Sequence, residues 1–243
     1  MSAFVFGDLE LTRYCLVQVE RPVGPRSRIQ SEQIPGRDGN VVVSVERELD
    51  SVTAHCLLKA RYAPSWQEVR SELAATLSPA REDRLYLPDE GGLWRLAVPS
   101  FDSNVTLPTQ EGLYQFDVSF ALSEAIAHGR TNAVTIPSGG SVEFRVGGTA
   151  PCAISISALA TRESLSRLWG VRFDDGDYLR VAIPTSSATP VEIDCESRVV
   201  RVGGNVSMVT MDSDWPMLTP GRHVARNDVG TGSATLTWEE RWY

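Results

Sequence analysis

From about Glu124 to its end, the chain consists of short strand-like segments separated by turns rich in glycine, proline and aspartate. Helical periodicity longer than two turns is absent from this half of the sequence. Regular short strands with such turns are typical of a β-sandwich or barrel. We therefore expect an all-β domain there, with strands at residues 141–146, 152–159, 178–183, 191–195, 198–202, 206–210, 222–226 and 235–242.

The first half of the chain differs because it adds one amphipathic helix to a set of strands. The motif Ser-Trp-Gln-Glu at residues 65–68 predicts a capping box, in which the serine and glutamate side chains each accept a backbone hydrogen bond. An apolar stripe follows at helical spacing, and Pro79 is expected to end the helix. The stripe comprises Trp66, Val69, Leu73 and Leu77.

Strands surround this helix on both sides. They are expected at residues 4–11, 15–20, 41–48, 51–60, 84–87, 94–99 and 113–122. The segment Pro-Asp-Glu-Gly-Gly at 88–92 predicts a hairpin between two of them. In the last strand, Phe116, Val118 and Phe120 occupy alternate positions, so we expect one buried, largely aromatic face.

The two patterns predict two domains with a boundary near residue 130. Residues 1–130 should form an α+β domain that is mostly β, and residues 131–243 should form an all-β sandwich. The joint is expected between residues 124 and 135, where polar residues and glycine interrupt both patterns.

A hexapeptide at residues 34–39, Ile-Pro-Gly-Arg-Asp-Gly, lies between a basic segment with several prolines and a valine-rich run. Proline fixes φ and glycine admits conformations closed to other residues, so the hexapeptide predicts a tight turn that opens onto a strand. An ordinary surface hairpin turn has the same composition. The more specific hypothesis is a turn in or beside an assembly hairpin, with Arg37 and Asp38 making charge contacts within the fold or between protomers. The residues of this motif are Pro35, Gly36, Arg37, Asp38 and Gly39.

The composition is that of a folded β-rich protein with an excess of acidic residues. The formal net charge is −8 at pH 7, whereas a nucleic-acid coat needs a basic face. No apolar run approaches the ~20 residues that span a bilayer, and the first residues lack the cationic and apolar regions of a signal peptide. We therefore expect synthesis in the cytoplasm, no membrane insertion and no nucleic-acid binding.

The residues that could carry redox or metal chemistry are scattered along the sequence. The four cysteines are far apart and lie in strand-like runs, which favours free thiols packed in a core over a redox or zinc role. The three histidines form no pair at metal-binding spacing. These residues are Cys15, Cys56, Cys152, Cys195, His55, His128 and His223.

Two acidic clusters allow a catalytic or metal interpretation. Asp-Asp-Gly-Asp at 174–177 lacks the spacing of a calcium loop and is better interpreted as a hairpin turn. Asp212 and Asp214, beside Trp215, could form a glycosidase pair, but acid pairs are frequent in a chain with 31 acidic residues. No nucleophile elbow and no phosphate-binding glycine motif occurs. We expect no enzymatic activity, no metal and no cofactor.

Several short motifs occur in a characteristic order along nearly the whole chain. They are Phe-Val-Phe-Gly at 4–7, Pro-Gly-Arg-Asp-Gly at 35–39, Arg-Leu-Tyr-Leu-Pro-Asp at 84–89, Gly-Gly-Thr-Ala-Pro at 147–151, Leu-Thr-Pro-Gly-Arg-His-Val-Ala at 218–225 and Trp-Glu-Glu-Arg-Trp-Tyr at 238–243. In this order they make the chain resemble the distal tail protein family of long-tailed (siphovirus) bacteriophages, of phage or prophage origin. The chain departs from that family at 123–126, Ser-Glu-Ala-Ile, where members often carry an Asp-Pro-Tyr-like segment.

The resemblance implies a mainly β fold, with an amino-terminal β-rich domain that carries one α-helix and a projecting hairpin, followed by a galectin-like β-sandwich. It implies a structural function as a hexameric ring at the virion tail tip. The partners implied are the tail tube protein, a tail tip or lysin-like protein and a receptor-binding protein carried by the outward second domains. Trp215 and Trp242 are candidates for aromatics that face a partner.

Two other classes of function remain open at the level of sequence. A carbohydrate-binding β-sandwich module would stack exposed aromatics on sugars, and a glycoside hydrolase accessory domain or remote enzyme would use an acid pair. The mass in solution separates them from a ring, because a monomer that binds glycans supports a module and a mass near six protomers supports a ring.

Overall fold

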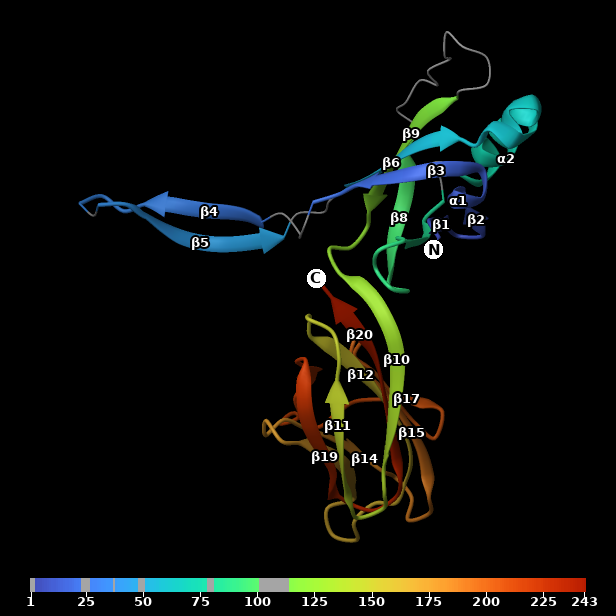
Figure 1. The fold of residues 1–243 in the computed structure, drawn as a ribbon. Coiled ribbons are helices and arrows are strands. Elements are labelled where there is room, and N and C mark those ends of the chain that lie inside the picture. Colours follow the sequence, from blue (N-terminus) through green and yellow to red (C-terminus); the bar gives the residue numbers. More distant parts are fainter. Residues whose placement is uncertain (1–2, 23–26, 37, 48–50, 78–80, 101–113) are drawn as a thin grey trace. The chain divides into compact units, whose positions relative to one another are not determined.

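The computed structural model describes residues 3–22, 27–36, 38–47, 51–77, 81–100 and 114–243. It is mainly β, as expected (Figure 1). The chain divides into two compact units, Met1–Ala127 together with Tyr243, and His128–Trp242. Each unit has its own hydrophobic core.

The first unit contains an antiparallel sheet whose strands follow the order β3-β6-β9-β8-β7-β1-β2. A separate two-stranded sheet is formed by β4 and β5. The elements are β1 (Val5–Phe6), β2 (Leu9–Glu10), α1 (Leu11–Tyr14), β3 (Cys15–Glu20), β4 (Ser27–Gln33), β5 (Asn40–Arg47), β6 (Ser51–Leu58), the 3-10 helix η1 (Ala60–Ser65), α2 (Trp66–Thr76), β7 (Asp83–Tyr86), β8 (Trp94–Ser100) and β9 (Gln115–Leu122).

The core of this unit forms where the sequence patterns place it. Phe120 of β9 packs against Phe4 and Phe6, with ring centroids 5.4 and 5.3 Å apart. The alternating face of β9 is buried, which confirms the expectation for that strand. The apolar stripe of α2 contributes Val69 and Leu73 to the same core.

Two local expectations in this unit are wrong. Residues 4–11 do not form one strand, because Gly7 adopts a φ of +55° and turns the chain so that β1 pairs with β2. A Cβ at Gly7 would lie 2.7 Å from Asp83 Oδ2, so any larger residue at this position would have to displace the Asp83 carboxylate. The capping box does not form either, since η1 leads directly into α2 and the Ser65 hydroxyl lies 3.3 Å from the Tyr62 carbonyl oxygen instead. Pro79 lies outside the described residues.

The second unit is a sandwich of two antiparallel layers. One layer contains the strands β17-β16-β15-β12-β20-β10 in that order, with β18 paired to β12, and the other contains β11-β19-β13-β14. Buried side chains of both layers, such as Ile156 and Leu179, form the core between them. The strands are β10 (Ala127–Ile136), β11 (Ser141–Val146), β12 (Cys152–Ala160), β13 (Leu168–Phe173), β14 (Tyr178–Ala182), β15 (Thr189–Asp194), β16 (Val199–Val202), β17 (Asn205–Ser207), β18 (Met217–Leu218), β19 (Gly221–Val229) and β20 (Ala234–Trp242).

Every strand expected in the second half is present, but three strands were missed: β10, β13 and the two-residue strand β18. The expected joint at 124–135 is mostly strand β10, whose polar residues His-Gly-Arg-Thr-Asn gave it the appearance of a loop. Strand β13 was missed because it contains Gly170, where a Cβ would lie 2.5 Å from the Leu179 carbonyl oxygen. The close approach of β13 and β14 therefore requires Gly170, and the same glycine interrupts the sequence pattern expected of a strand.

Strand β10 covers most of the expected joint, so a separable second domain must begin before it. We predict that a fragment of residues 124–243 folds alone into a β-rich domain with a cooperative thermal transition, because it retains the whole core of the second unit. A matched fragment of residues 141–243 should be insoluble or unfolded, because it lacks β10 with its buried Ile136. Circular dichroism and thermal melting of both fragments test this, and an unfolded 124–243 fragment would refute it.

His55 connects three strands of the first unit. From β6, its Nδ1 lies 2.9 Å from Asp117 Oδ1 on β9, and its Nε2 lies 3.1 Å from Glu20 Oε2 on β3. The hydrogen bonds to Asp117 and then Glu20 raise the pKa of His55, because both carboxylates favour a ring that is protonated on both nitrogens.

The raised pKa of His55 predicts the direction in which stability changes with pH. The stabilisation is fully present below the unfolded pKa of about 6.5 and is lost as pH rises through the higher folded pKa. Urea unfolding should therefore show the first unit becoming slightly less stable from pH 6 toward pH 8, and His55→Gln should flatten that slope. The effect should be modest because the side chain is about one-third exposed. A slope of the opposite sign, or one unchanged in the variant, would contradict the assignment.

Candidate assembly surface

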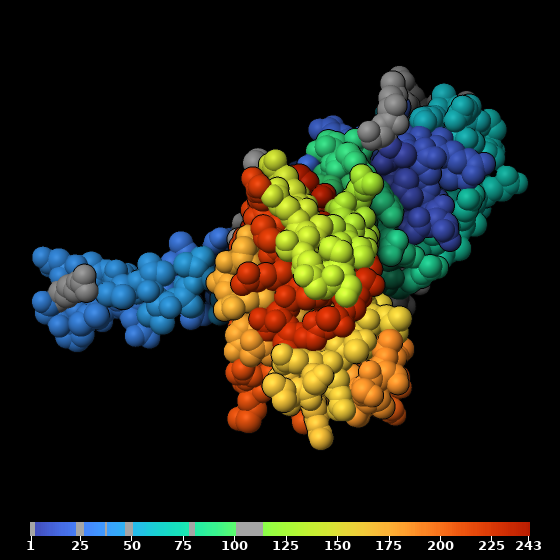
Figure 2. Space-filling model, turned by 90° about the horizontal axis from the view of Figure 1, so that it is seen from below, coloured from blue at the N-terminus to red at the C-terminus, as the bar shows by residue number. Residues whose placement is uncertain are grey.

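The β4–β5 hairpin is a sheet of two strands only. The pairing runs in antiparallel register from Ser27 opposite Arg47 to Gln33 opposite Asn40, with a bulge between Gln30 and Ser31. Within the described part of the chain, no further strand pairs with either edge. In Figure 2 these residues, drawn in blue, form a narrow rod of side chains that faces solvent on the visible side.

The turn of this hairpin is the hexapeptide that the sequence singles out. Gly36 and Gly39 have φ of +83° and +90°, which confirms the expected glycine-dependent turn. No atom lies within 4 Å of a Cβ built on either glycine, so the requirement is one of backbone conformation alone. Asp38 is exposed, and Arg37 lies outside the described residues. A role of this turn in assembly stays a prediction.

Apolar side chains cover the hairpin although nothing described packs on it. Ile29 and Val45 lie directly opposite each other and are 62% and 61% exposed. Val42 and Val43 are also more than half exposed. A two-stranded hairpin is marginally stable in water by itself, and exposed apolar patches with free strand edges mark interaction sites. The hairpin therefore has the character of an incomplete interface.

An ion-pair network holds the chain just before the hairpin. Arg21, which follows β3, pairs with Asp89 at 2.6 Å and with Glu90. Arg95 of β8 also reaches Glu90, with Nη2 at 3.0 Å from Oε1. The side chain of Glu90 is only 7% exposed, so one buried carboxylate joins the segment that leads into the hairpin to the turn between β7 and β8.

This network predicts unequal effects for its two carboxylates. Glu90→Gln should destabilise the first unit by about 1–3 kcal/mol, because it leaves two guanidinium groups facing a neutral amide in a partly buried position. Asp89→Asn is the matched control and should cost less than about 1 kcal/mol, since the Asp89 side chain is 60% exposed. Urea unfolding measures both values. Equal and negligible effects would mean that the network does not hold this segment.

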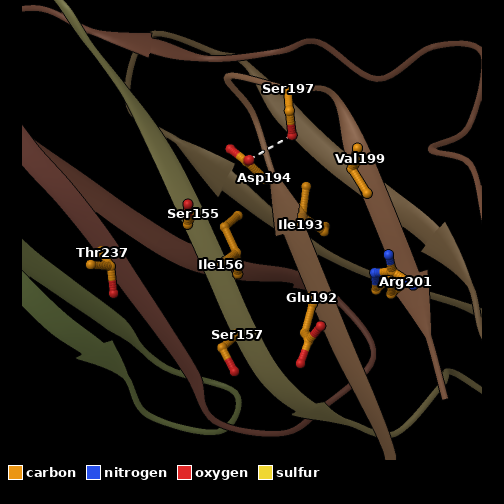
Figure 3. A pocket seen from close by; sticks show the side chains of 10 residues that line it. All are labelled: Ser155, Ile156, Ser157, Glu192, Ile193, Asp194, Ser197, Val199, Arg201 and Thr237. Atoms are coloured by element: carbon orange, nitrogen blue, oxygen red, sulfur yellow. Dashed lines mark hydrogen bonds between the residues drawn. The ribbon is translucent and has the colours of Figure 1, made fainter. Parts of the chain in front are cut away.

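A groove of about 400 Å³ lies on the second unit, over strands β12, β15, β16 and β20 (Figure 3). Its lining includes serine and threonine hydroxyls and the charged side chains of Glu192 and Arg201, and none of the lining residues is aromatic. Trp215 is half-buried against the core, and Trp242 is half-buried with its indole N–H enclosed. A role for these two tryptophans in facing a partner stays a prediction.

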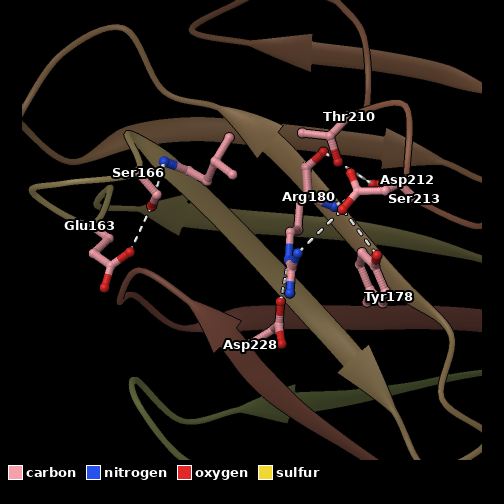
Figure 4. A network of polar contacts seen from close by, with 9 residues as sticks. Glu163, Ser166, Tyr178, Arg180, Thr210, Asp212, Ser213 and Asp228 are labelled. Carbon is pink, nitrogen blue, oxygen red and sulfur yellow. Dashed lines mark hydrogen bonds and ion pairs between the residues drawn. The ribbon is translucent and has the colours of Figure 1, made fainter.

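Of the acid pair, the side chain of Asp212 is part of a structural network (Figure 4), and the backbone N–H of Asp214 donates to the Tyr178 carbonyl oxygen at 2.9 Å. The Tyr178 hydroxyl donates to Asp212 Oδ2 at 3.0 Å, and Arg180 lies between Asp228 at 2.5 Å and Asp212 at 3.4 Å. Hydrogen bonds from Thr210 and then Tyr178 lower the pKa of Asp212, so this carboxylate is held ionised and is unsuited to donate a proton.

The remaining candidates for chemistry also have structural roles. The acidic segment at 174–177 is the turn between β13 and β14, with Gly176 at a φ of +101°, as expected. All four cysteines are free and buried, which confirms that expectation, and burial raises the pKa of Cys152 to about 11 and of Cys195 to about 12. The described residues contain no group of three or more acidic, histidine or cysteine side chains that could hold a metal ion. No helix among them is long and apolar enough to cross a membrane.

The fold consists of two β units, and the first carries a hairpin with exposed apolar side chains. Residues 9–122 match the family profile described as the phage tail protein RIFT-related domain, and residues 147–242 match that of the siphovirus-type tail component, C-terminal domain. The chain therefore belongs to the distal tail protein family of siphovirus bacteriophages, whose place in the virion is the tail tip.

One solved structure shows the same fold over nearly the whole chain. The crystal structure of the SPP1 Dit protein (gp 19.1), described as a paradigm of the hub adsorption apparatus in phages that infect Gram-positive bacteria, matches with a TM-score of 0.78 and 14% sequence identity. That match covers 99% of each chain. A chain in the phage P2 baseplate structure, in its activated conformation with Ca, matches with a TM-score of 0.49 and 9% identity, over 96% of this chain and 92% of that chain. No curated protein sequence matches.

Proposed function

We propose that this tail component closes into a hexameric ring through its β4–β5 hairpin. The observation that supports the proposal is the exposure of Ile29, Val42, Val43 and Val45 on a two-stranded sheet whose edges pair with no other described strand. A free edge recruits another strand by main-chain hydrogen bonds. Hairpins contributed by neighbouring protomers would give each edge a partner.

A ring also satisfies the symmetry of such a contact. In a heterologous contact, one side of the hairpin binds a different surface on the next protomer. Repeated contacts of this kind close into a ring when the rotation between protomers allows it. Burial of each valine or isoleucine side chain would contribute about 1.5–3 kcal/mol. Every interface would bury several of them, so modest contacts repeated around the ring give a stable assembly.

The proposed ring has further partners. It would connect the tail tube protein on one side to a tail tip or lysin-like protein on the other, while the second unit, a galectin-like sandwich in this proposal, carries a receptor-binding protein. We infer that the protein works through these surfaces and without enzymatic turnover. In support, the acids and thiols that could serve catalysis are engaged in turns, ion pairs and cores.

The experiment compares two double variants of the full chain. Val43→Glu with Val45→Glu places two charges on the hairpin, and Val206→Glu with Met208→Glu places the same charges at equally spaced, exposed positions of the second unit. Light scattering over a concentration series, with and without purified tail tube protein, reports the mass. The hairpin variant should weaken ring formation by at least about tenfold, and the control should leave it unchanged.

Two outcomes would overturn the proposal. One is a ring that forms equally well in the hairpin variant. The other is a wild-type chain that stays monomeric at every concentration, with tail tube protein present and absent.

A further inference from the structure

The outer face of the β11-β19-β13-β14 layer places arginines directly opposite one another. Arg145 of β11 is the register partner of Arg222 on β19. Farther along β19, Arg226 is the register partner of Arg172 on β13. Each arginine has at least one buried sequence neighbour, such as Phe144, His223 or Ala225, so these side chains share the solvent-facing side of the layer.

Carboxylates neutralise only part of this charge. Arg222 pairs with Glu143, and Arg180, on the same face, pairs with Asp228 and Asp212 (Figure 4). Arg145, Arg172 and Arg226 have no ion pair among the described residues; the Arg172 guanidinium lies 5.9 Å from the centre of the Tyr178 ring. The face is therefore a basic patch on a chain whose net charge is −8.

Like charges directly opposite each other destabilise an antiparallel pair of strands. This layer contains two such pairs: Glu143 partly offsets the repulsion between Arg145 and Arg222, whereas no carboxylate pairs with Arg172 or Arg226 among the described residues. Local arrangements that cost stability tend to coincide with functional sites. The two arginine pairs are therefore a reason to look for an anionic ligand.

The surface is hollowed beside both pairs. A cavity of about 420 Å³ lies against Arg172 and Arg226, with Phe173, Gly176 and Val224 in its wall. Asp174 is also in this wall, and its Oδ1 lies 3.5 Å from Nδ1 of the buried His223. A second cavity of about 520 Å³ lies against Arg145, Arg222 and Glu143, the carboxylate that pairs with Arg222. Because Arg222 and Arg226 are four residues apart on one strand, the two pairs are about 13 Å apart.

The number of donors in each pair favours phosphate over carboxylate. One guanidinium already binds both oxygens of a carboxylate in a bidentate pair. Two guanidinium groups side by side match a phosphate, which offers more acceptor oxygens and more negative charge. A nucleic acid fits poorly, because Phe173 is buried and the Tyr178 ring has the Arg180 guanidinium 4.2 Å from its centre, so neither ring offers a free platform for base stacking.

We propose that this face binds a polymer with repeating phosphate groups, with one phosphate at each arginine pair. This function is independent of ring formation, because it uses only residues of the second unit. The polymer is defined by its chemistry: anionic phosphates spaced along a flexible chain that carries no bases.

Binding of labelled sodium polyphosphate to the full chain, followed by fluorescence anisotropy, tests the proposal. Arg172→Gln with Arg226→Gln should weaken binding by at least about tenfold, since charge-assisted hydrogen bonds are lost from one pair. The control is Arg70→Gln with Arg201→Gln, which removes the same charge from exposed arginines on α2 and β16. The control should bind as the wild type does.

Two further measurements separate selective binding from general attraction or misfolding. Polyglutamate of matched charge should bind at least about tenfold more weakly than polyphosphate at the same salt concentration. The Arg172→Gln and Arg226→Gln variant should melt at the same or a higher temperature, because it removes a like-charge pair. Equal loss of binding in both double variants, or polyglutamate binding as tightly as polyphosphate, would overturn the proposal.

Discussion

A two-stranded sheet cannot bury either of its faces by itself, and the β4–β5 hairpin is such a sheet. The sheet of the first unit and the sandwich of the second each enclose a core, so both are complete as folded bodies. The β4–β5 hairpin has no such core, and its apolar side chains and both strand edges face solvent. Arg21 and the buried Glu90 fasten the segment that leads into it to the folded body. The first unit therefore combines a stable support with an element that needs a partner.

The sequence predicts those parts of the fold in which one side of an element is buried. Strand β9 and the stripe of α2 were found because burial on one face creates a period of two or of 3.6 residues. Strand β4 was missed for the opposite reason, since all its side chains are exposed and Ile29 is its one large apolar residue. The glycine turn of the hairpin was found because a positive φ restricts composition regardless of burial.

The arginine pairs could not have been found from the sequence. Arg172 and Arg226 are far apart along the chain, and their opposition depends on the pairing of β13 with β19 and on a register shift between Gly170 and Val171. Strand register is a property of the assembled sheet. The acids and cysteines differ from the arginines, because the sequence allowed a chemical role for them. In the fold they lie in turns, ion pairs and cores. Among the described residues, Arg145, Arg172 and Arg226 of one face have no ion pair, and the apolar side chains of the hairpin remain largely exposed.

Hydrogen exchange of the backbone amides in β4 and β5 tests the central claim most directly. In the dispersed chain these amides should exchange rapidly, because a two-stranded sheet without a core opens easily. In assembled tails the same amides should be strongly protected, while those of β9 in the core of the first unit should be protected in both states. Equal exchange of β4 and β5 in the dispersed and assembled protein would contradict the claim that the hairpin is the incomplete element that the ring covers.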